Sequence, residues 1–260
     1  MSGQVDDQPS SSNVRAVVRA VAVLRAFSVD RPHLSLTEVV RITKLDKATT
    51  RRLLLTLIGL DLVVQDQRSH EYSLSTRMLD FVEAVPVFNG LSGEATPFMM
   101  DLAHHTQTTV FLSIYERGEA VCIARVQGDR AILVRWWNVG GRQAVNTGAA
   151  PRVLFAFQPP DEIERRLERD DFPKLTPMTE TSVEQLRDKL ELVRSRGWDV
   201  AEDDVAIGLA AAGVPIFSRD GRIAAALSIG GLKDNIIDSG KPKYLKELTA
   251  CARKISDIIR

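Results

Sequence analysis

Residues 34–60 read LSLTEVVRITKLDKATTRRLLLTLIGL and decide the fold of the N-terminal part of the chain. Ser35 and Glu38 have the spacing of a capping box, in front of a short stretch whose apolar residues recur at helical spacing. Asp46 is placed to cap a second, longer helix after a tight break. Two helices joined by so short a connection predict a helix-turn-helix.

The segment before this motif predicts one more helix. It runs from a cap at Asn13 to about Ser28, and its apolar stripe consists of Val14, Val17, Val18, Val21, Leu24 and Phe27.

The segment after the motif predicts a hairpin and a connector. Residues 62–65 and 71–74 alternate like two strands around a polar tip, which makes the hairpin a wing. Ser75 is placed to cap a connector helix that continues to about Ala84, and Pro86 with Asn89-Gly90 is expected to end it.

Positive charge is concentrated in this part of the chain. The whole chain holds 34 basic and 34 acidic residues. Between Asn13 and Arg77, however, eleven Lys or Arg stand against six Asp or Glu, and Arg41–Arg52 holds five basic residues and one acid, Asp46. A local basic patch on a neutral chain is typical of a DNA-binding head on a body that does not bind DNA.

The third helix carries the side chains that major-groove reading needs, because Arg matches guanine and Thr bonds phosphate or touches a thymine methyl. Two adjacent arginines alone are equally typical of a solvated face, but a preceding short helix and a following hairpin favour DNA binding. The inner face is predicted to hold Thr50, Leu53, Leu54 and Leu57. The residues predicted to contact DNA are Ser35, Thr37, Lys44, Lys47, Ala48, Thr49, Thr50, Arg51, Arg52 and, at the wing tip, Arg68.

The composition predicts a globular protein with two domains. The chain has 260 residues, of which 44% are hydrophobic and 26% charged. No apolar run reaches the roughly 20 residues that span a bilayer, and the polar first dozen residues do not form a signal peptide, so we expect a cytoplasmic protein without membrane contact. Cys122 and Cys251 lie far apart among apolar neighbours and are predicted to be buried thiols.

Beyond residue 90 the pattern changes to mixed helices and strands. Helices are predicted near 94–105, 150–157, 161–168, 183–196 and at the C-terminus, and strands at 109–115, 120–126, 132–136, 214–217 and 223–229. Asp220-Gly221 between the last two strands is a strong hairpin signal. We therefore expect an α+β fold, with an antiparallel sheet and flanking helices.

Small residues stand at the start of one of these helices. Gly148, Ala149 and Ala150 precede a helix predicted to begin near Pro151, and backbone N–H groups at an unobstructed helix start can hold a carboxylate. Close packing also requires small residues, and the residues alone favour this simpler interpretation.

Several segments resemble the IclR family of bacterial transcriptional regulators. In the head, RAVAVLRAFS, LSLTEV, LDKATTRRLLLTL and YSLS look like the winged helix of that family. In the body, TGAAPRVLFAF resembles its entry to the effector pocket, and RSRGWDVAEDDVAIGLAAAGVPIFSRDGRIAAALSIGG its closing signature. The resemblance spans residues 14 to 232.

This resemblance implies a division of the chain and a set of partners. We expect a disordered leader (1–12), a winged helix-turn-helix domain (13–74), a connector helix and linker (75–90), and a GAF-like domain for effector binding and oligomerisation (91–260). The effector is expected to be a small organic acid. Because one head buries too little for useful specificity, a homodimer on a palindromic operator is expected. The resemblance further implies a dimer of dimers, formed through the body. Val17, Val21 and Leu79 are spare apolar residues suited to pairing the heads.

Carried over residue by residue, the family's effector positions are Gly148 and Ala149 at the helix entry, Ala201 and Ala211 on the middle loop, and Ser228 and Gly230 on the last strand. Family members that bind small hydrophilic acids have Asp, Cys and Ser where this chain has Ala201, Ala211 and Gly230. The loss of these polar groups predicts a larger or more aromatic acid, or no effector. Trp136 is added as a wall residue, since of the adjacent Trp136 and Trp137 one faces away from the other.

The head departs from the family pattern at two positions. Val40 and Lys44 stand where Ala and Gly are usual, and a Gly at the second would supply a left-handed backbone at the end of the helix. The turn is therefore expected to have a different shape and one additional positive charge.

Two alternatives stay open. One is a DNA-binding regulator without an effector, whose pocket would be filled by Trp136, Phe155 or Phe217. The other is a body with residual enzymatic activity, although the chain has no G-x-S-x-G, phosphate-binding Gly-Lys loop or HExxH motif. The acidic run 202–204 is predicted to be a solvated loop. We expect no enzyme activity, catalytic residue, metal or cofactor.

Overall fold

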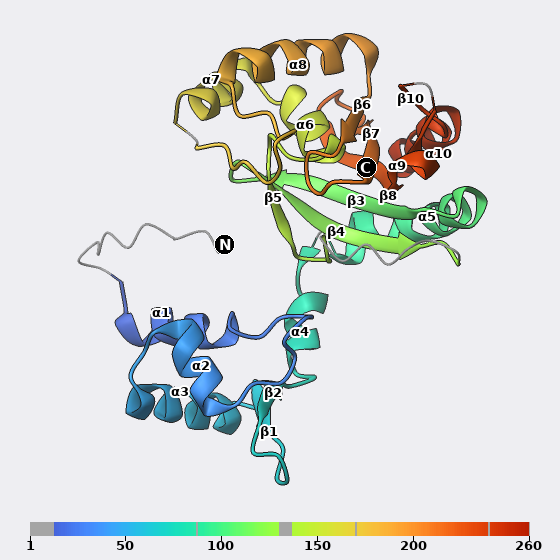
Figure 1. The fold of residues 1–260 in the computed structure, drawn as a ribbon. Coiled ribbons are helices and arrows are strands. Elements are labelled where there is room, and N and C mark those ends of the chain that lie inside the picture. The colour runs from blue at the N-terminus through green and yellow to red at the C-terminus, as the bar shows by residue number, and fades with distance from the viewer. Residues whose placement is uncertain (1–12, 87, 130–136, 170, 239, 260) are drawn as a thin grey trace. The chain divides into compact units, whose positions relative to one another are not determined.

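The computed structural model describes residues 13–86, 88–129, 137–169, 171–238 and 240–259. The chain divides into two compact units, residues 1–85 and 86–260, and each is described by itself (Figure 1). The predicted leader, the predicted strand 132–136 and Trp136 lie outside the described residues. Among the described helices, none is long and apolar enough to cross a membrane.

The first unit is a winged helix-turn-helix. Its elements are α1 (Arg15–Leu24), α2 (Leu36–Thr43), α3 (Lys47–Gly59), β1 (Val63–Gln65), β2 (Tyr72–Leu74) and α4 (Met78–Glu83). The antiparallel pair β1–β2 confirms the predicted wing. Backbone bonds in both directions between Leu34 and Tyr72 tie the wing to the chain just before α2.

Local caps place the two helices of the motif as predicted. The Ser35 hydroxyl accepts the Glu38 N–H at 3.3 Å, and the Ser35 N–H donates to the Glu38 carboxylate at 2.8 Å. Asp46 accepts the N–H of Thr49 at 2.8 Å, which lowers the pKa of that carboxyl. These caps satisfy N–H groups that the first turn of a helix cannot pair internally.

Two helix starts in this unit differ from the prediction. α1 begins after Val14, with no side-chain cap, so the predicted cap at Asn13 is wrong; the helix also ends earlier, at Leu24, and continues as turns. α4 begins at Met78 because the Ser75 hydroxyl accepts the N–H of Arg77, two residues on, and so caps a turn that precedes the helix.

The second unit contains the larger core. Its elements are a π-helical turn (Phe88–Ser92), α5 (Gly93–Thr106), β3 (Thr109–Glu116), β4 (Glu119–Gln127), β5 (Arg142–Ala144), α6 (Ala149–Ala156), α7 (Pro160–Arg169), α8 (Val183–Arg196), β6 (Asp199–Glu202), β7 (Leu209–Phe217), β8 (Ile223–Leu232), α9 (Lys233–Ile236), β9 (Ile237–Asp238), β10 (Lys241–Pro242) and α10 (Leu245–Ile258). The connector helix α4 ends at Glu83 with Ala84 as its C-cap, which confirms the predicted end near Ala84. Asn89-Gly90 lie in the helical turn Phe88–Ser92, which leads directly into α5.

An antiparallel sheet of order β5-β4-β3-β8-β7-β6 lies at the centre of this unit, which confirms the predicted α+β class. Alternate residues of each strand serve two cores. On one face Val110 and Leu112 pack with α5 and α10, and on the other Phe111 packs with α6, which α8 covers (Figure 1).

The sequence pattern did not predict β5 and β6, which are only three and four residues long. β6 changes the position of two predicted effector residues. Ala201 and Ala211 do not lie on a loop, because they face each other directly as paired residues of β6 and β7.

A buried ion network joins α6 to β6. Arg152 of α6 is fully buried, and its guanidinium donates to Asp199 and to Asp204, each at 2.6 Å. It also donates to the backbone oxygens of Asn146 and Val200 at 3.0 and 3.2 Å. Although burial alone lowers the pKa of Arg152, the two carboxylates raise it above its ordinary value. Every nitrogen of this guanidinium is therefore satisfied.

The same network holds the loop after β6. Asp204 also accepts the N–H of Gly148 at 3.0 Å, and its backbone oxygen accepts the Thr179 hydroxyl. Asp203 accepts the N–H of Gly208 at 2.6 Å and the Lys233 ammonium at 3.2 Å. The acidic run 202–204 is therefore not the solvated loop that we predicted, because Arg152 and Lys233 neutralise it.

We predict that Arg152→Met destabilises the second unit by about 3–5 kcal/mol, because it leaves the buried Asp204 without its cation and Asp199 with Arg196 alone, at 2.7 Å. Chemical unfolding of the full chain, followed by the signal of the second unit, measures the change.

Arg187→Met is the matched control. Arg187 of α8 pairs with Glu164 at 3.0 Å, but both side chains are substantially exposed, 41% and 53%. An exposed pair contributes at most about 1 kcal/mol. Equal losses of stability in the two variants would contradict a dominant role of the buried network.

Candidate functional site

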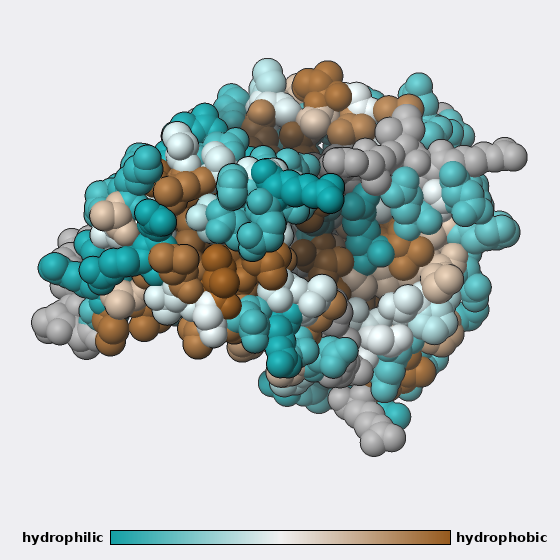
Figure 2. All heavy atoms as spheres, turned by 90° about the horizontal axis from the view of Figure 1, so that it is seen from below, coloured by the Kyte–Doolittle hydropathy of each residue, from teal (hydrophilic) through white to brown (hydrophobic). Residues whose placement is uncertain are grey.

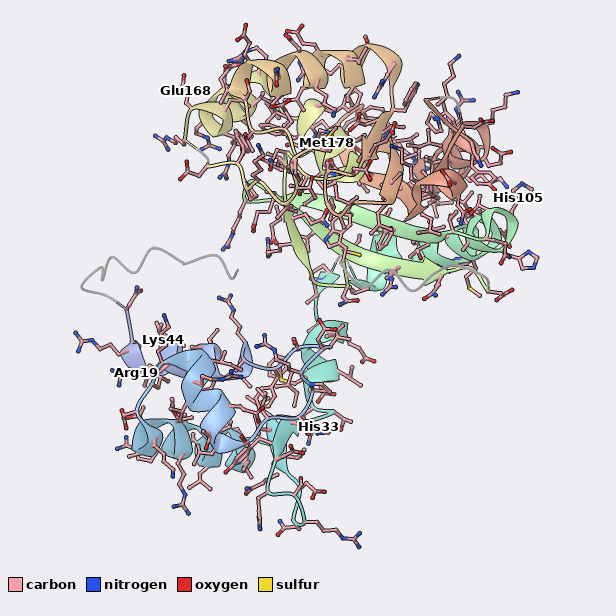
Figure 3. The ribbon with its side chains drawn as sticks, viewed as in Figure 1. Arg19, His33, Lys44, His105, Glu168 and Met178 are labelled. Carbon is pink, nitrogen blue, oxygen red and sulfur yellow. The ribbon has the colours of Figure 1, made fainter. Side chains whose placement is uncertain are left out.

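The turn between α2 and α3 keeps a left-handed backbone despite its lysine. Lys44, labelled in Figure 3, has φ 56° and ψ 19°, and its N–H donates to the Val40 oxygen at 2.9 Å. The different turn shape that we expected from Lys44 is therefore not found. A non-glycine residue in this region costs about 1 kcal/mol, and the lysine side chain adds an exposed positive charge at the end of α2.

α3 presents a basic face to solvent. Lys47, Arg51 and Arg52 are exposed, as is Ala48, while Thr49 is half-buried. The inner face is as predicted for Leu54 and Leu57, which are buried, whereas Leu53 is half-buried.

Two predicted DNA-contacting hydroxyls are already used inside the head. Thr50 is fully buried and donates to the Asp46 oxygen at 2.9 Å, so its side chain cannot reach DNA and the prediction for it is corrected. The hydroxyl of Ser35 donates to the Glu38 carboxylate at 2.7 Å as part of the capping box. Thr37, one turn into α2, is exposed.

The wing tip is a compact polar turn. Asp66 accepts the N–H of Ser69 at 2.7 Å and that of Arg68 at 2.8 Å, and these bonds lower the pKa of the Asp66 carboxyl. The Arg68 side chain is exposed beyond this turn. The head therefore offers cations on α3, at the end of α2 and on the wing, which is the arrangement that groove and phosphate contacts require.

Part of the surface of the head is apolar. Along α1, Val14, Val17, Val18 and Val21 are 64%, 59%, 51% and 39% exposed, whereas Phe27 of the predicted stripe is buried. Leu79 of α4 is 60% exposed. Hydrophobic patches also stand out among hydrophilic side chains in the space-filling view of one face (Figure 2).

A small cavity lies between the sheet and the start of α6. Its volume is about 20 Å³, and its walls are Phe111, Trp137, Gln143, Gly148, Ala149, Ala150, Pro151, Val205, Ala211 and Ser228. Four of the predicted effector positions are among these residues, namely Gly148, Ala149, Ala211 and Ser228. Ala201 and Gly230 are not, although each is paired directly with Ala211 across the sheet.

The helix entry is built by close approach of two backbones. Gly148 has φ 78°, and a Cβ on Gly213 of β7 would lie only 3.1 Å from the backbone nitrogen of Ala150. These glycines let the start of α6 rest directly on the sheet. The N–H of Gly148 is not free for a ligand carboxylate, because it donates to Asp204.

Aromatic side chains fill the other side of the cavity. The rings of Phe111 and Trp137 are stacked with centroids 5.8 Å apart, and the Trp137 indole N–H donates to the Gly141 oxygen at 2.9 Å. Phe155 stacks on Tyr115 and Phe217 packs on Phe157, so neither fills the cavity as we expected for a body without an effector.

The sequence reasoning missed Phe111, Gln143 and Val205 as wall residues and Arg152 as the anchor of one wall. Phe111 could have been found from its place within a strand, but the partners of Arg152 are remote in the sequence and carried no local signal.

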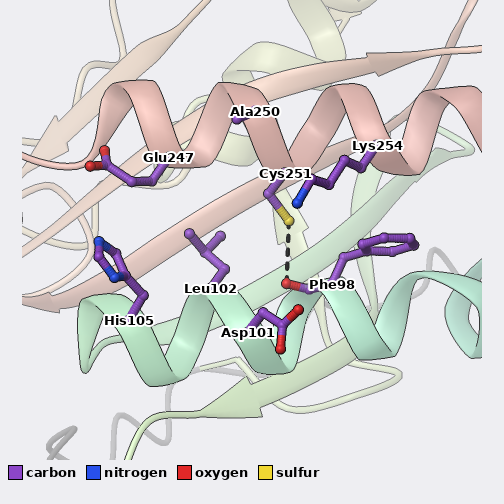
Figure 4. Close-up of a pocket in the computed structure, with 8 residues that line it drawn as sticks. All are labelled: Phe98, Asp101, Leu102, His105, Glu247, Ala250, Cys251 and Lys254. Atoms are coloured by element: carbon purple, nitrogen blue, oxygen red, sulfur yellow. Dashed lines mark hydrogen bonds between the residues drawn. The ribbon is translucent and has the colours of Figure 1, made fainter.

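A wider groove of about 280 Å³ lies on the opposite side of the sheet, between α5 and α10 (Figure 4). Asp101, Glu247 and Lys254 lie around it, so it carries charges of both signs. The Cys251 thiol donates to the Phe98 oxygen at 3.4 Å, and burial raises the pKa of this thiol to about 11. Both cysteines are free and buried, as predicted, and Cys122 has a pKa raised to about 12 by burial.

Metal chemistry has no candidate site in the described part of the chain, where no three His, Cys, Asp or Glu side chains are grouped to hold an ion.

Both units match models of known protein families. Residues 16–67 match the IclR helix-turn-helix domain, and residues 87–257 match the domain described as bacterial transcriptional regulator IclR C-terminal.

Among curated proteins, the chain is 28% identical to the HTH-type transcriptional regulator KdgR of Dickeya chrysanthemi over 254 residues, which cover 97% of this chain and 82% of that protein. It is 26% identical to the Pca regulon regulatory protein of Pseudomonas putida over 241 residues, which cover 92% of this chain and 82% of that protein.

Solved structures show the same fold. An IclR homolog from Microbacterium hydrocarbonoxydans, solved in complex with 4-hydroxybenzoate, has a TM-score of 0.82 at 23% identity and covers 94% of this chain and 99% of its own. The IclR transcriptional regulator from Alicyclobacillus acidocaldarius has a TM-score of 0.80 at 24% identity and covers 94% and 98%. The two family matches together span most of the chain, and the head presents an exposed basic helix. This protein is therefore a DNA-binding transcriptional regulator that belongs to the IclR family.

Proposed function

We propose that this regulator binds a palindromic operator through α3, Lys44 and the wing, as a homodimer or a dimer of dimers, and that a small aromatic acid in the α6 cavity modulates this binding. We further infer that it acts in the cytoplasm and has no enzymatic activity. The proposed DNA-binding surface is supported above all by one observation: Lys47, Arg51 and Arg52 are exposed on a helix whose opposite face is buried.

Arg52→Ala is predicted to weaken operator binding by about 1–3 kcal/mol if Arg52 reads a base, and to reduce the salt dependence if it binds phosphate. The operator is first selected from random DNA with the purified protein, and affinity is then measured by gel-shift titration at fixed salt. Arg187→Ala removes the same charge from α8 and serves as the control. An unchanged affinity of a folded Arg52→Ala variant would refute this role.

The exposed apolar face of α1 supports pairing of the heads. The exposed Val17, Val18 and Val21 of α1, with Val14 at its N-cap, form a surface that a second copy can cover. Two paired heads would read both halves of a palindrome.

We predict that Val17→Asp weakens binding to the full palindrome on the order of 100-fold, because the second head no longer binds as part of one unit. Binding to a single half-site should not change. Ala16→Asp is the matched control, because Ala16 is the exposed neighbour of Val17 on another face of α1. If both variants lose the same affinity, α1 does not pair the heads.

An aromatic effector is supported by the walls of the cavity. Phe111 and Trp137 offer stacked rings, while Ala211 supplies no polar group, and Ser228 and Gln143 are the polar side chains of the wall. The Microbacterium homolog of the same fold was solved with 4-hydroxybenzoate. At about 20 Å³ the cavity has space for one water molecule, so an effector must bind a state in which the wall has moved.

A second candidate function is DNA binding without an effector. The small volume of the cavity favours it, because Phe111 and Trp137 already occupy much of the space between α6 and the sheet.

Isothermal titration of the full chain with aromatic and aliphatic acids distinguishes the two functions. We expect aromatic carboxylates to bind more tightly than aliphatic ones, and Ala211→Leu to abolish binding by filling the cavity. Ala250→Leu, an equal change at the α5–α10 groove, should have no effect. Tight binding of glyoxylate or pyruvate without any response to aromatic acids would refute an aromatic effector, and no response to any acid would favour the second function.

A further inference from the structure

Two side chains with unpaired buried polar atoms, Arg125 and Thr109, lie on the sheet face that carries Phe111. In the described part of the chain, the buried side-chain atoms that lack a hydrogen-bond partner belong to three residues: Thr109, Arg125 and Asn146. For Arg125 they are the Nε and Nη2 atoms, and for Thr109 the hydroxyl oxygen. Such buried groups are rare in folded proteins, because each loses its hydrogen bonds to water without replacement.

Strand register places Arg125 on the cavity face of the sheet. Arg125 of β4 lies directly opposite Phe111 of β3, which lies opposite Ser228 of β8. Residues directly opposite on antiparallel strands point to the same face. Since Phe111 and Ser228 both line the cavity, the Arg125 side chain leaves the sheet on that side as well.

The guanidinium of Arg125 reaches over the aromatic wall. Its central carbon lies 5.9 Å from the centre of the Phe111 ring, and its Nη1 atom donates to the Asn138 side chain at 3.1 Å. Asn138 directly follows Trp137, which stacks on Phe111. One of the three nitrogens is therefore used to hold the group in place, and the other two remain available.

Thr109 adds a second donor on the same face. It lies two residues before Phe111 on β3 and is fully buried. It is thus a diagonal neighbour of Arg125, a spacing that a long side chain bridges. A guanidinium edge and a hydroxyl on one side of an aromatic ring match a planar carboxylate, which accepts two parallel N–H bonds from arginine and one more bond at a free lone pair.

We infer that Arg125 and Thr109 bind the carboxylate of an aryl carboxylic acid, whose ring lies against Phe111 and Trp137. This inference rests on the proposed effector function and deepens it, because it assigns the acid group to the β3–β4 side of the cavity instead of to the start of α6. At the start of α6, the N–H of Gly148 is already bound to Asp204. Arg125 therefore sets the requirement for a negative charge, and the rings set the requirement for an aromatic body.

The test compares two probes of similar shape, 4-hydroxybenzoate and its uncharged amide 4-hydroxybenzamide, by isothermal titration of the full-length protein. Arg125→Met is expected to weaken binding of the carboxylate on the order of 30-fold or more, because it removes one partner of a buried charge pair. Thr109→Val should weaken it roughly 10-fold, the effect of one hydrogen bond to a charged group. Neither variant should change binding of the amide by more than about 3-fold. Arg187→Met, which removes a surface charge, should bind both probes like the wild type.

The melting temperature of the ligand-free protein gives an independent readout. Because Arg125→Met removes a half-buried cation with two buried, unpaired donors and a single hydrogen bond to Asn138, it should melt at the wild-type temperature or above it. An arginine with a structural role would leave several partners unpaired when removed. Arg125→Lys keeps the charge without the planar fork and should recover only part of the affinity for the carboxylate.

The possible results distinguish a wrong assignment of Arg125 from a failure of the proposed effector function. If Arg125→Met binds 4-hydroxybenzoate as tightly as the wild type does, the assignment of Arg125 is wrong and the aromatic effector stands. If Arg125→Met melts well below the wild type or loses both probes equally, Arg125 has a structural role and the assignment is likewise overturned. If the wild type binds neither aromatic probe, the proposed effector function fails, and the inference fails with it.

Discussion

The buried pairing of Arg152 with Asp199 and Asp204 is the interaction on which the second unit depends. A guanidinium without access to water is tolerable only when its donors are all used, so α6, β6 and the following loop must meet in one arrangement. That arrangement also builds the cavity, because Asp204 holds Gly148 and the next residue, Val205, is part of the wall. Stability and the shape of the proposed site thus have a common cause.

The small volume of the cavity bears on how the proposed effector would regulate the protein. Its walls are small residues on the α6 side and stacked rings on the β3 side, and little space remains between them. A ligand that enters must bind an open state in preference to the closed one, and its apparent affinity is lowered by the rarity of that state. The same preference is what allows binding to shift the protein between two forms.

The head relies on local interactions to a greater extent. Side-chain caps at Ser35 and Asp46 begin its two central helices, and Lys44 takes a left-handed conformation that glycine would adopt at lower cost. In exchange, the turn carries a positive charge close to the basic face of α3. Thr50 shows how strictly the two faces of that helix differ: it is buried and bonded to the backbone while its neighbour Arg51 is exposed.

The sequence by itself determined the helix-turn-helix, the wing, the long helices and the antiparallel hairpins, because caps, turns and apolar periods act between residues a few positions apart. It also indicated the family and much of the cavity wall, through motifs that are continuous in the chain. Only the tertiary structure decided the rest. Arg152 is 47 residues from Asp199 and 52 from Asp204, and the short strand β6 that positions Asp199 has no pattern of its own. Likewise, the unpaired donors of Arg125 became visible only once strand register had placed them beside Phe111, since burial and hydrogen bonding depend on residues remote in the sequence.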